Sequence, residues 1–235
     1  MQDFTESLLD AFRLIAGLDR DLLEVVALSL EVSVGAVVAA GLIGLPVGAL
    51  LAVARFRGRG GVIVVVNALM GLPPVVVGLA VYLMLSNAGP LGVFQLLYTP
   101  TAMIIAQTIL VAPIVTALTR QSIEDLKGEY EEQLRVFGLG LGGMVATLLW
   151  EARYSLLTAL LAGFGRAIAE VGAVIIVGGN IDHVTRVMTT AIALETSKGN
   201  LALALGLGMI LLLLTVAINA AVMGLRMTAW RSAHA

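Results

Sequence analysis

The residues whose types could support chemistry lie mostly in one polar stretch, residues 120–153, between two long apolar runs. Charged side chains recur along it, namely Glu124, Asp125, Lys127, Glu129, Glu131, Glu132, Arg135, Glu151 and Arg153. Apolar side chains that need a surface to pack against are interspersed, namely Leu134, Val136, Phe137, Met144, Val145, Leu148, Leu149 and Trp150. A loop of this length is usually functional or disordered, and the apolar side chains argue against disorder. We expect this stretch to dock a partner protein.

Two ionisable residues, Arg166 and Glu170, lie within the apolar run that follows. Charged groups inside a membrane are costly and often functional. Their i,i+4 spacing places both on one face of a helix, where they can form an intramembrane ion pair. A structural pair that keeps both charges tolerable and an anion path lined by Arg166 both remain open, and neutralisation by Glu170 favours the structural pair.

Uncharged polar residues are further candidates within the apolar runs, namely Asn67, Gln107, Thr108 and Asn219. Interhelical hydrogen bonds explain most such residues in membrane proteins, and lining of a transport pathway is the alternative. The glycines, among them Gly44 and Gly48 at GxxxG spacing, indicate close contacts between helices.

Several kinds of chemistry are excluded by what the chain lacks. It has no cysteine, and its two histidines, His183 and His234, cannot form a multi-histidine metal site within one chain. Gly138, Gly140 and Gly143 match a dinucleotide-binding pattern, but they follow a charged, helix-forming segment instead of a strand. These glycines indicate a break between two helices, one ending near residue 137 and one running from about residue 144. We expect no catalytic residue, no metal and no cofactor bound by this chain, and its net charge of −2 does not suggest nucleic acid.

Composition identifies the chain as an integral membrane protein. Of its 235 residues 59% are hydrophobic and 13% are charged, and the mean hydropathy is +1.00. Soluble domains are about 45–50% apolar and about 25% charged. The acidic N-terminus lacks the basic segment with which a cleaved signal peptide begins.

Five apolar runs are each long enough to cross a bilayer, at residues 32–54, 62–85, 101–118, 154–177 and 201–225. The second run contains Pro73 and Pro74, which must kink or break its helix because proline has no backbone N–H. Amphipathic patterns predict a helix over residues 3–20, lying in the membrane interface or packed on the bundle, and a short helix around residues 184–192. We predict an all-α integral membrane protein with five transmembrane helices, in a single domain over residues 1–235.

Basic residues orient these spans, because short cytoplasmic loops carry an excess of Lys and Arg. The first and third connections and the C-terminal tail hold Arg55, Arg57, Arg59, Arg120, Lys127, Arg135, Arg153, Arg226 and Arg231. The opposite side holds Arg13, Arg20, Arg186 and Lys198. The N-terminus is therefore predicted outside the cell, and the C-terminus and the polar stretch are predicted in the cytoplasm.

Residues 132–138, EQLRVFG, resemble the cytoplasmic "EAA" loop of ABC importer permeases, in which a Glu precedes a Gly by six positions. Gln133 and Leu134 stand where that loop has alanines. Residues 164–173 are similar to a second stretch of the family, F-x-R-A-x-x-E-x-G-A, and GGNI follows at residues 178–181. The resemblance covers about residues 25–226. Residues 178–181 and 185–200 look most like the tungstate branch of the family.

The resemblance implies the transmembrane subunit of an ATP-driven importer in a prokaryotic plasma membrane. It is not itself expected to be an enzyme, because a separate subunit would hydrolyse ATP. Implied partners are a second copy of this chain, two ATP-binding cassette subunits on the cytoplasmic side, an external substrate-binding protein and membrane lipid. The residues that it assigns to ATPase coupling are Glu132, Arg135, Gly138, Gly142 and Gly143. The implied cargo is an oxyanion, tungstate first and molybdate next.

Three alternatives are retained, namely a permease of this family for another small solute, a self-contained secondary carrier and a non-transporting assembly or anchor subunit. Carriers usually contain internal repeats and ion sites at broken helices. No repeat is found in this sequence, and five spans cannot be divided into two equal halves, which favours the importer subunit.

Overall fold

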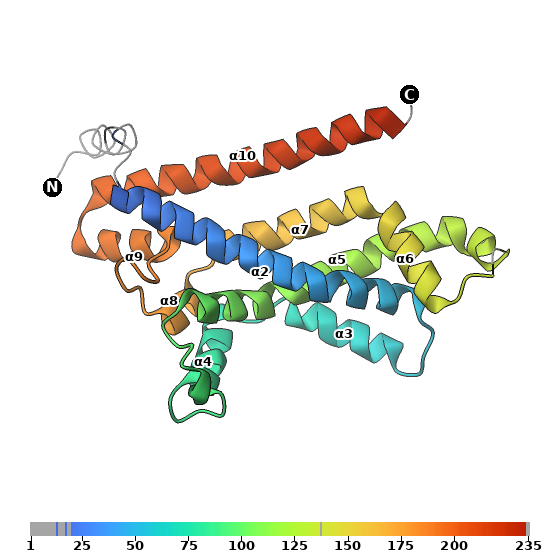
Figure 1. The fold of residues 1–235 in the computed structure, drawn as a ribbon, viewed down its shortest axis with the longest axis horizontal. Helices are drawn as coiled ribbons and strands as arrows, with labels where there is room; N and C mark the ends of the chain where they lie inside the picture. The colour runs from blue at the N-terminus through green and yellow to red at the C-terminus, as the bar shows by residue number, and fades with distance from the viewer. Residues whose placement is uncertain (1–12, 14–16, 18–19, 137, 234–235) are drawn as a thin grey trace. The chain divides into compact units, whose positions relative to one another are not determined.

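The computed structural model describes residues 13, 17, 20–136 and 138–233, without the side chains of residues 131, 132, 135 and 225–233. The amphipathic helix predicted over residues 3–20 thus lies outside the described residues. Within the described residues the chain is helical and has no strand, which confirms the all-α prediction. The elements are α2 (Arg20–Val53), α3 (Arg59–Leu69), α4 (Pro74–Leu85), the 3-10 turn η1 (Gly92–Phe94), α5 (Pro100–Val136), α6 (Leu141–Glu151), α7 (Arg153–Ile168), α8 (Gly172–Gly178), α9 (Met188–Lys198) and α10 (Leu201–Ala233) (Figure 1).

Among the described helices, α2, α5 and α10 are each long and apolar enough to cross a membrane alone. The pairs α3–α4 and α6–α7 meet the same criteria together, but they are bent by 98° and 76° at their breaks. The described residues therefore contain three spans, or up to five if each bent pair counts as one.

The break predicted in the second apolar run is confirmed. α3 ends at Leu69, and α4 begins with Pro74 at its first position, where a missing N–H leaves no helical bond unmade. Between them, the N–H groups of Gly71 and Leu72 donate to the carbonyls of Ala68 and Leu69 at 3.1 and 3.2 Å. The chain therefore bends sharply here while these backbone groups remain hydrogen-bonded.

The fourth apolar run, residues 154–177, is not one helix as predicted. α7 stops at Ile168 and α8 starts at Gly172, so the bent pair that meets the criteria for a span is α6–α7. The Glu170 carboxylate lies in the gap and accepts a hydrogen bond from the N–H of Ala173 at 3.1 Å. Such side-chain bonds compete with helix continuation, and hydropathy does not detect them.

The short helix predicted around residues 184–192 begins later, at Met188, and continues to Lys198 as α9. Thr185 holds the preceding loop out of the helix. Its hydroxyl donates to the Gly178 carbonyl at 2.5 Å and accepts from the Ile181 N–H at 3.0 Å. A side chain that bonds to nearby backbone in this way favours a loop over a helix.

The described chain divides into two compact units, and the first comprises residues 1–33, 74–106 and 168–235. Within this unit α4 packs on α8, and α9 packs on α10 (Figure 1). Gly78 permits the α4–α8 contact, because a Cβ atom there would lie 2.8 Å from the Cα of Ala173.

The second unit comprises residues 34–73 and 107–167. In it, the second half of α2 crosses α5 at two glycines. A Cβ atom on Gly44 would lie 3.0 Å from the Val115 side chain, and one on Gly48 would lie 2.5 Å from the Thr116 carbonyl oxygen. The prediction that this GxxxG pair makes close helix contacts is confirmed.

Candidate functional site

The polar stretch folds as an extension of α5 followed by α6, and α6 is seated on an apolar cluster. Its buried members come from α2, α5, α6 and the start of α7, namely Ala49, Ala52, Val53, Ile123, Leu134, Leu148, Ala152 and Leu156. Met144, Val145 and Leu149 are partly buried against this cluster. Five of the eight apolar residues of the stretch therefore pack against the helices as predicted, namely Leu134, Met144, Val145, Leu148 and Leu149.

The break between α5 and α6 has the geometry of a helix end closed by glycine. Gly138 has φ +67°, the left-handed conformation that glycine adopts without the penalty of a Cβ atom. The N–H of Leu139 donates to the Leu134 carbonyl at 3.4 Å, the long bond that closes a Schellman turn. The predicted break between two helices is confirmed, with α6 starting at Leu141.

The remaining glycines of the break differ in the space around them. Gly142 and Gly143 lie in the first turn of α6. A Cβ atom on Gly142 or on Gly138 would meet no described atom within 4 Å, whereas one on Gly143 would lie 3.1 Å from Leu139 Cδ2. Glycine is therefore required at position 138 because of its backbone conformation. At Gly142, in contrast, a larger side chain would find unoccupied space.

Glu132 and Arg135 lie on the last turns of α5. Their side chains lie outside the part of the chain that the structure describes. The assignment of these two residues and of Gly138, Gly142 and Gly143 to ATPase coupling stays a prediction.

Exposed apolar side chains lie around the break and at the far end of α6. Val136 is 86% exposed and Trp150 is 69% exposed, and Leu139 and Leu141 are exposed as well. Arg153 lies over the Trp150 ring, 4.9 Å from its centroid, and donates to the Trp150 carbonyl at 2.7 Å. The segment thus buries Leu148 within the subunit, while apolar side chains are exposed around the break and, beside Arg153, at Trp150.

The uncharged polar residues predicted within spans take different places. Gln107 is buried, and its Nε2 donates to a carbonyl near the end of α7 at 3.0 Å. Thr108 Oγ1 donates to a carbonyl of α2 at 3.5 Å. Asn67 is exposed on α3, and the exposed Asn219 donates to a carbonyl one turn earlier on α10 at 2.8 Å. Gln107 and Thr108 therefore link helices, and a pathway role for all four residues stays a prediction.

Arg166 and Glu170 do not share a helix, because α7 ends at Ile168. Glu170 is buried; its carboxylate accepts the Ala173 N–H and its carbonyl accepts the Thr189 hydroxyl at 2.8 Å. The predicted common helix face is therefore wrong, since the chain leaves the helix between the two residues. The ion pair itself stays a prediction.

The structure contains a charged cluster near the end of α2 that the sequence analysis did not predict. Glu124 of α5 accepts hydrogen bonds from Arg59, at the start of α3, and from Arg120, one turn earlier on α5. Arg59 Nε also donates to the Leu51 carbonyl of α2 at 2.7 Å. The i,i+4 spacing of Arg120 and Glu124 is the local signal for part of this cluster, whereas Arg59 is distant in sequence.

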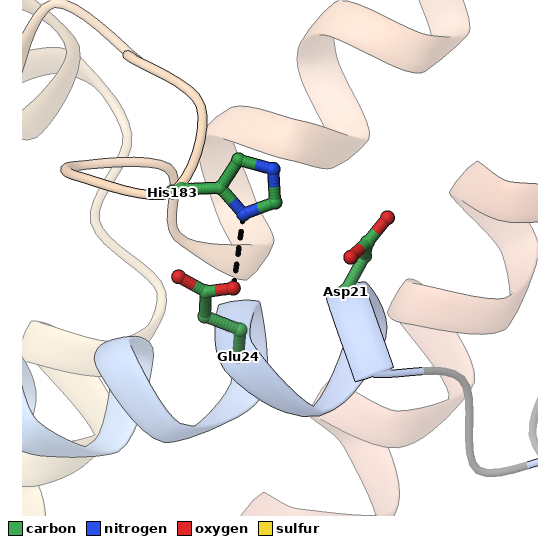
Figure 2. Close-up of side chains that lie close together, drawn as sticks. All are labelled: Asp21, Glu24 and His183. Carbon is green, nitrogen blue, oxygen red and sulfur yellow. Dashed lines mark hydrogen bonds and ion pairs between the residues drawn. The ribbon is translucent and has the colours of Figure 1, made fainter.

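In the first unit, His183 faces Glu24 and Asp21, which lie one turn apart on α2 (Figure 2). Its Nδ1 lies 2.9 Å from the Glu24 carboxylate, and this hydrogen bond raises the pKa of His183 above its usual 6.5. Each of the three residues offers one ligand atom within 4.8 Å of the others, so together they could hold a metal ion. All three are exposed, and the positive end of α2 opposes a cation. We therefore assign His183 and Glu24 to an ion pair, to which the nearby Asp21 adds negative charge.

A cavity of about 510 Å³ opens beside this ion pair, lined by residues of α2, α9 and α10. Several charged residues in its lining have partners within the chain. Arg186 pairs with Asp182 at 2.6 Å. Hydrogen bonds from Lys198 at 2.9 Å and Asn200 at 3.0 Å lower the pKa of the buried Glu195 carboxyl. These charges therefore stabilise the loop and α9 by mutual pairing.

The helices and the folded loop define an all-helical, multi-pass membrane protein. Residues 44–227 match the family described as "binding-protein-dependent transport system inner membrane component". The chain belongs to this family, whose members are components of transporters, not enzymes. The resemblance found in the sequence is thereby confirmed, and the self-contained secondary carrier is set aside because the family works with a binding protein.

Relatives cover most of the chain. It is 42% identical over 204 residues to a probable anion ABC transporter permease protein from Haloferax volcanii, covering 85% of this chain and 88% of the relative. It is 39% identical over 226 residues to a tungstate uptake system permease protein from Peptoclostridium acidaminophilum, covering 96% and 99%. A tungstate uptake system permease protein from Campylobacter jejuni is 43% identical over 138 residues, covering 59% of this chain and 58% of the relative.

Proposed function

We propose that this chain is the membrane-spanning subunit of an ATP-driven importer of oxyanions, with tungstate as first cargo and molybdate as second. The observation that carries this proposal is the similarity to the tungstate uptake permease of Peptoclostridium acidaminophilum, which extends over 96% of this chain. Relatives named for molybdenum transport are more distant, for example one from Bacillus subtilis at 27% identity. We therefore rank tungstate above molybdate as the proposed cargo.

The break between α5 and α6 is the proposed docking site for a separate ATPase subunit. Its support is the exposed apolar side chains of Val136, Leu139 and Leu141 around the break, next to α6, which is itself seated on α2 and α5. The excess of basic residues on this side supports a cytoplasmic position for it, with the N-terminus outside. Two copies of the chain form the pathway, since closed two-fold pairs are the commonest oligomers. A binding protein delivers the anion from the opposite side.

The charge of the predicted spans suits a divalent anion. Glu170 is a buried acid, and its carboxylate is hydrogen-bonded to the N–H of Ala173. Cation channels, in contrast, commonly use rings of Asp or Glu. Glu170 is the one acidic residue among the described residues of the predicted spans, so a path through them would repel an oxyanion less than such a ring does.

The test is reconstitution of this chain in proteoliposomes with its ATPase subunit and binding protein. We expect tungstate to stimulate ATP hydrolysis at the lowest concentration, followed by molybdate and then sulfate. Stimulation by a sugar or an amino acid without stimulation by oxyanions would overturn the cargo. The mass of the purified complex measures whether it contains two copies of this chain.

A further inference from the structure

The C-terminal end of α2 is held by cations from two other helices. The carbonyls of Leu51, Ala52 and Val53 belong to the last turn of α2, where no partner exists within the helix. Arg59 Nε donates to Leu51 at 2.7 Å, and Lys127 Nζ donates to Ala52 at 3.4 Å and to Val53 at 3.3 Å. Positive charge here also complements the negative end of the helix dipole.

Glu124 orients the arginine that makes this contact. One oxygen of its carboxylate accepts from Arg59 and the other accepts from Arg120. The Arg59 and Glu124 side chains are each 31% exposed, so solvent screens their charges less than at an open surface. Without the carboxylate, the cations Arg59, Arg120 and Lys127 would repel one another, and Arg59 would lose the partner that aims it at α2.

The same region supports α6. Ala52 and Val53, whose carbonyls bind Lys127, also contribute side chains to the apolar cluster that buries Leu148 of α6. α5 is one uninterrupted helix from Glu124 to the glycine break before α6. A displacement of α6 therefore reaches α2 both through the apolar cluster and along α5, and Glu124 lies where α5 is joined to α2 and α3.

We propose that Glu124 is a positioning residue that makes the end of α2, the start of α3 and α5 move as one body when an ATPase subunit displaces α6. This inference rests on the proposed function. Apolar contacts alone permit one helix to slide along another, whereas a carboxylate shared by two arginines fixes direction as well as distance. Glu124 thereby determines how much of the motion at α6 reaches the spans.

The first test compares Glu124→Gln with Asp125→Asn in the reconstituted complex with ATPase and binding protein. Asp125 is the matched control because it is exposed on the same turn of α5 and loses the same charge. We expect Glu124→Gln to assemble and to hydrolyse ATP, while tungstate uptake per ATP hydrolysed falls at least about fivefold, the lower end of typical coupling effects. An unchanged ratio of uptake to hydrolysis in Glu124→Gln would overturn the proposal.

The second test joins the two helices covalently. The chain has no cysteine, so the double variant Arg59→Cys, Glu124→Cys offers a single pair of thiols to a short bifunctional thiol reagent. We expect this variant to be uncoupled before the reagent is added and to regain uptake per ATP afterwards. Failure of the cross-link to restore the ratio, or inhibition by it, would show that the two helices need not move together.

These outcomes separate the inference from the proposed function. If the wild-type complex shows no tungstate-stimulated ATP hydrolysis, the proposed function fails whatever the variants do. If the wild type is stimulated and Glu124→Gln behaves like it, the inference alone fails. If Glu124→Gln does not assemble with the ATPase, the cross-linked double variant is the deciding test. Restored assembly and coupling in that variant would support the inference that α3 and α5 move together, and their absence would contradict it.

Discussion

Gly48 of α2 approaches Thr116 of α5 so closely that a Cβ atom on Gly48 would lie 2.5 Å from the Thr116 carbonyl oxygen. The obstructing atom belongs to the backbone of α5 and cannot turn away as a side chain could. The two helices are therefore in backbone contact at this crossing, and no larger residue fits without moving one of them.

Gly48→Ala should lower the stability of the isolated subunit by about 1–3 kcal/mol, the usual cost of overpacking. Thermal unfolding in detergent measures the change. Gly128→Ala is the control, because Gly128 lies on α5 with no atom within 4 Å of its Cβ position. It should be neutral or stabilising by up to about 1 kcal/mol. Equal unfolding temperatures for the two variants would contradict the close crossing.

Gly138→Val should disturb the break between α5 and α6, because the left-handed backbone costs a residue with a Cβ atom about 1–2 kcal/mol. We expect membrane insertion to be intact and ATP hydrolysis to be uncoupled from transport or the ATPase to be released. Co-purification with the ATPase and uptake assays measure both. Gly138→Asn is the control, since Asn tolerates this conformation better. Wild-type transport by the valine variant would remove the coupling role of Gly138.

Gly142→Ala should have opposite effects on the stability of the isolated subunit and on its binding to the ATPase. No described atom lies within 4 Å of the Cβ position, so the isolated subunit should gain about 0.5–1 kcal/mol of stability from the loss of a helical glycine. If the ATPase packs against this turn, the added methyl group should weaken its binding. Thermal unfolding of the subunit and titration with the ATPase give the two values. Unaltered ATPase binding would place Gly142 outside the interface.

The His183–Glu24 hydrogen bond predicts a dependence on pH. Because the folded pKa of His183 is raised above 6.5, mainly by Glu24, the protonated ring stabilises the loop below about 6.5. This contribution is lost as the pH rises through the raised pKa. An NMR titration of the ring, in a variant without His234, should give a pKa that returns toward 6.5 on Glu24→Gln. Asp182→Asn should shift it less. An identical pKa in Glu24→Gln would exclude the bond.

The orientation predicted from basic residues is tested by labelling single cysteines. Gly128→Cys on α5 and Ser197→Cys on α9 place thiols at exposed positions. An impermeant maleimide applied to intact cells should label residue 197 and leave residue 128 unlabelled until the membrane is opened. Labelling of both from the same side would reject the orientation and the cytoplasmic docking site with it.

Many helices and helix breaks of this protein could be predicted from local sequence composition. Long apolar runs identify α2, α5 and α10, the paired prolines identify the break before Pro74, and Gly138 identifies the end of α5. Each is a property of neighbouring residues, so it can be read along the chain. The resemblance of the polar stretch to an importer family has the same local basis.

Two features of the structure could not be predicted from hydropathy or from residue spacing. Helix α7 ends within the fourth apolar run, where the Glu170 carboxylate accepts a hydrogen bond from the N–H of Ala173. Hydropathy does not indicate whether a side-chain hydrogen bond of this kind will interrupt a helix. The joint between Arg59 and Glu124 exists because the Gly48 crossing brings the end of α2 against α5. The contact between Arg59 and Glu124 arises from three-dimensional packing, and no spacing along the sequence specifies it.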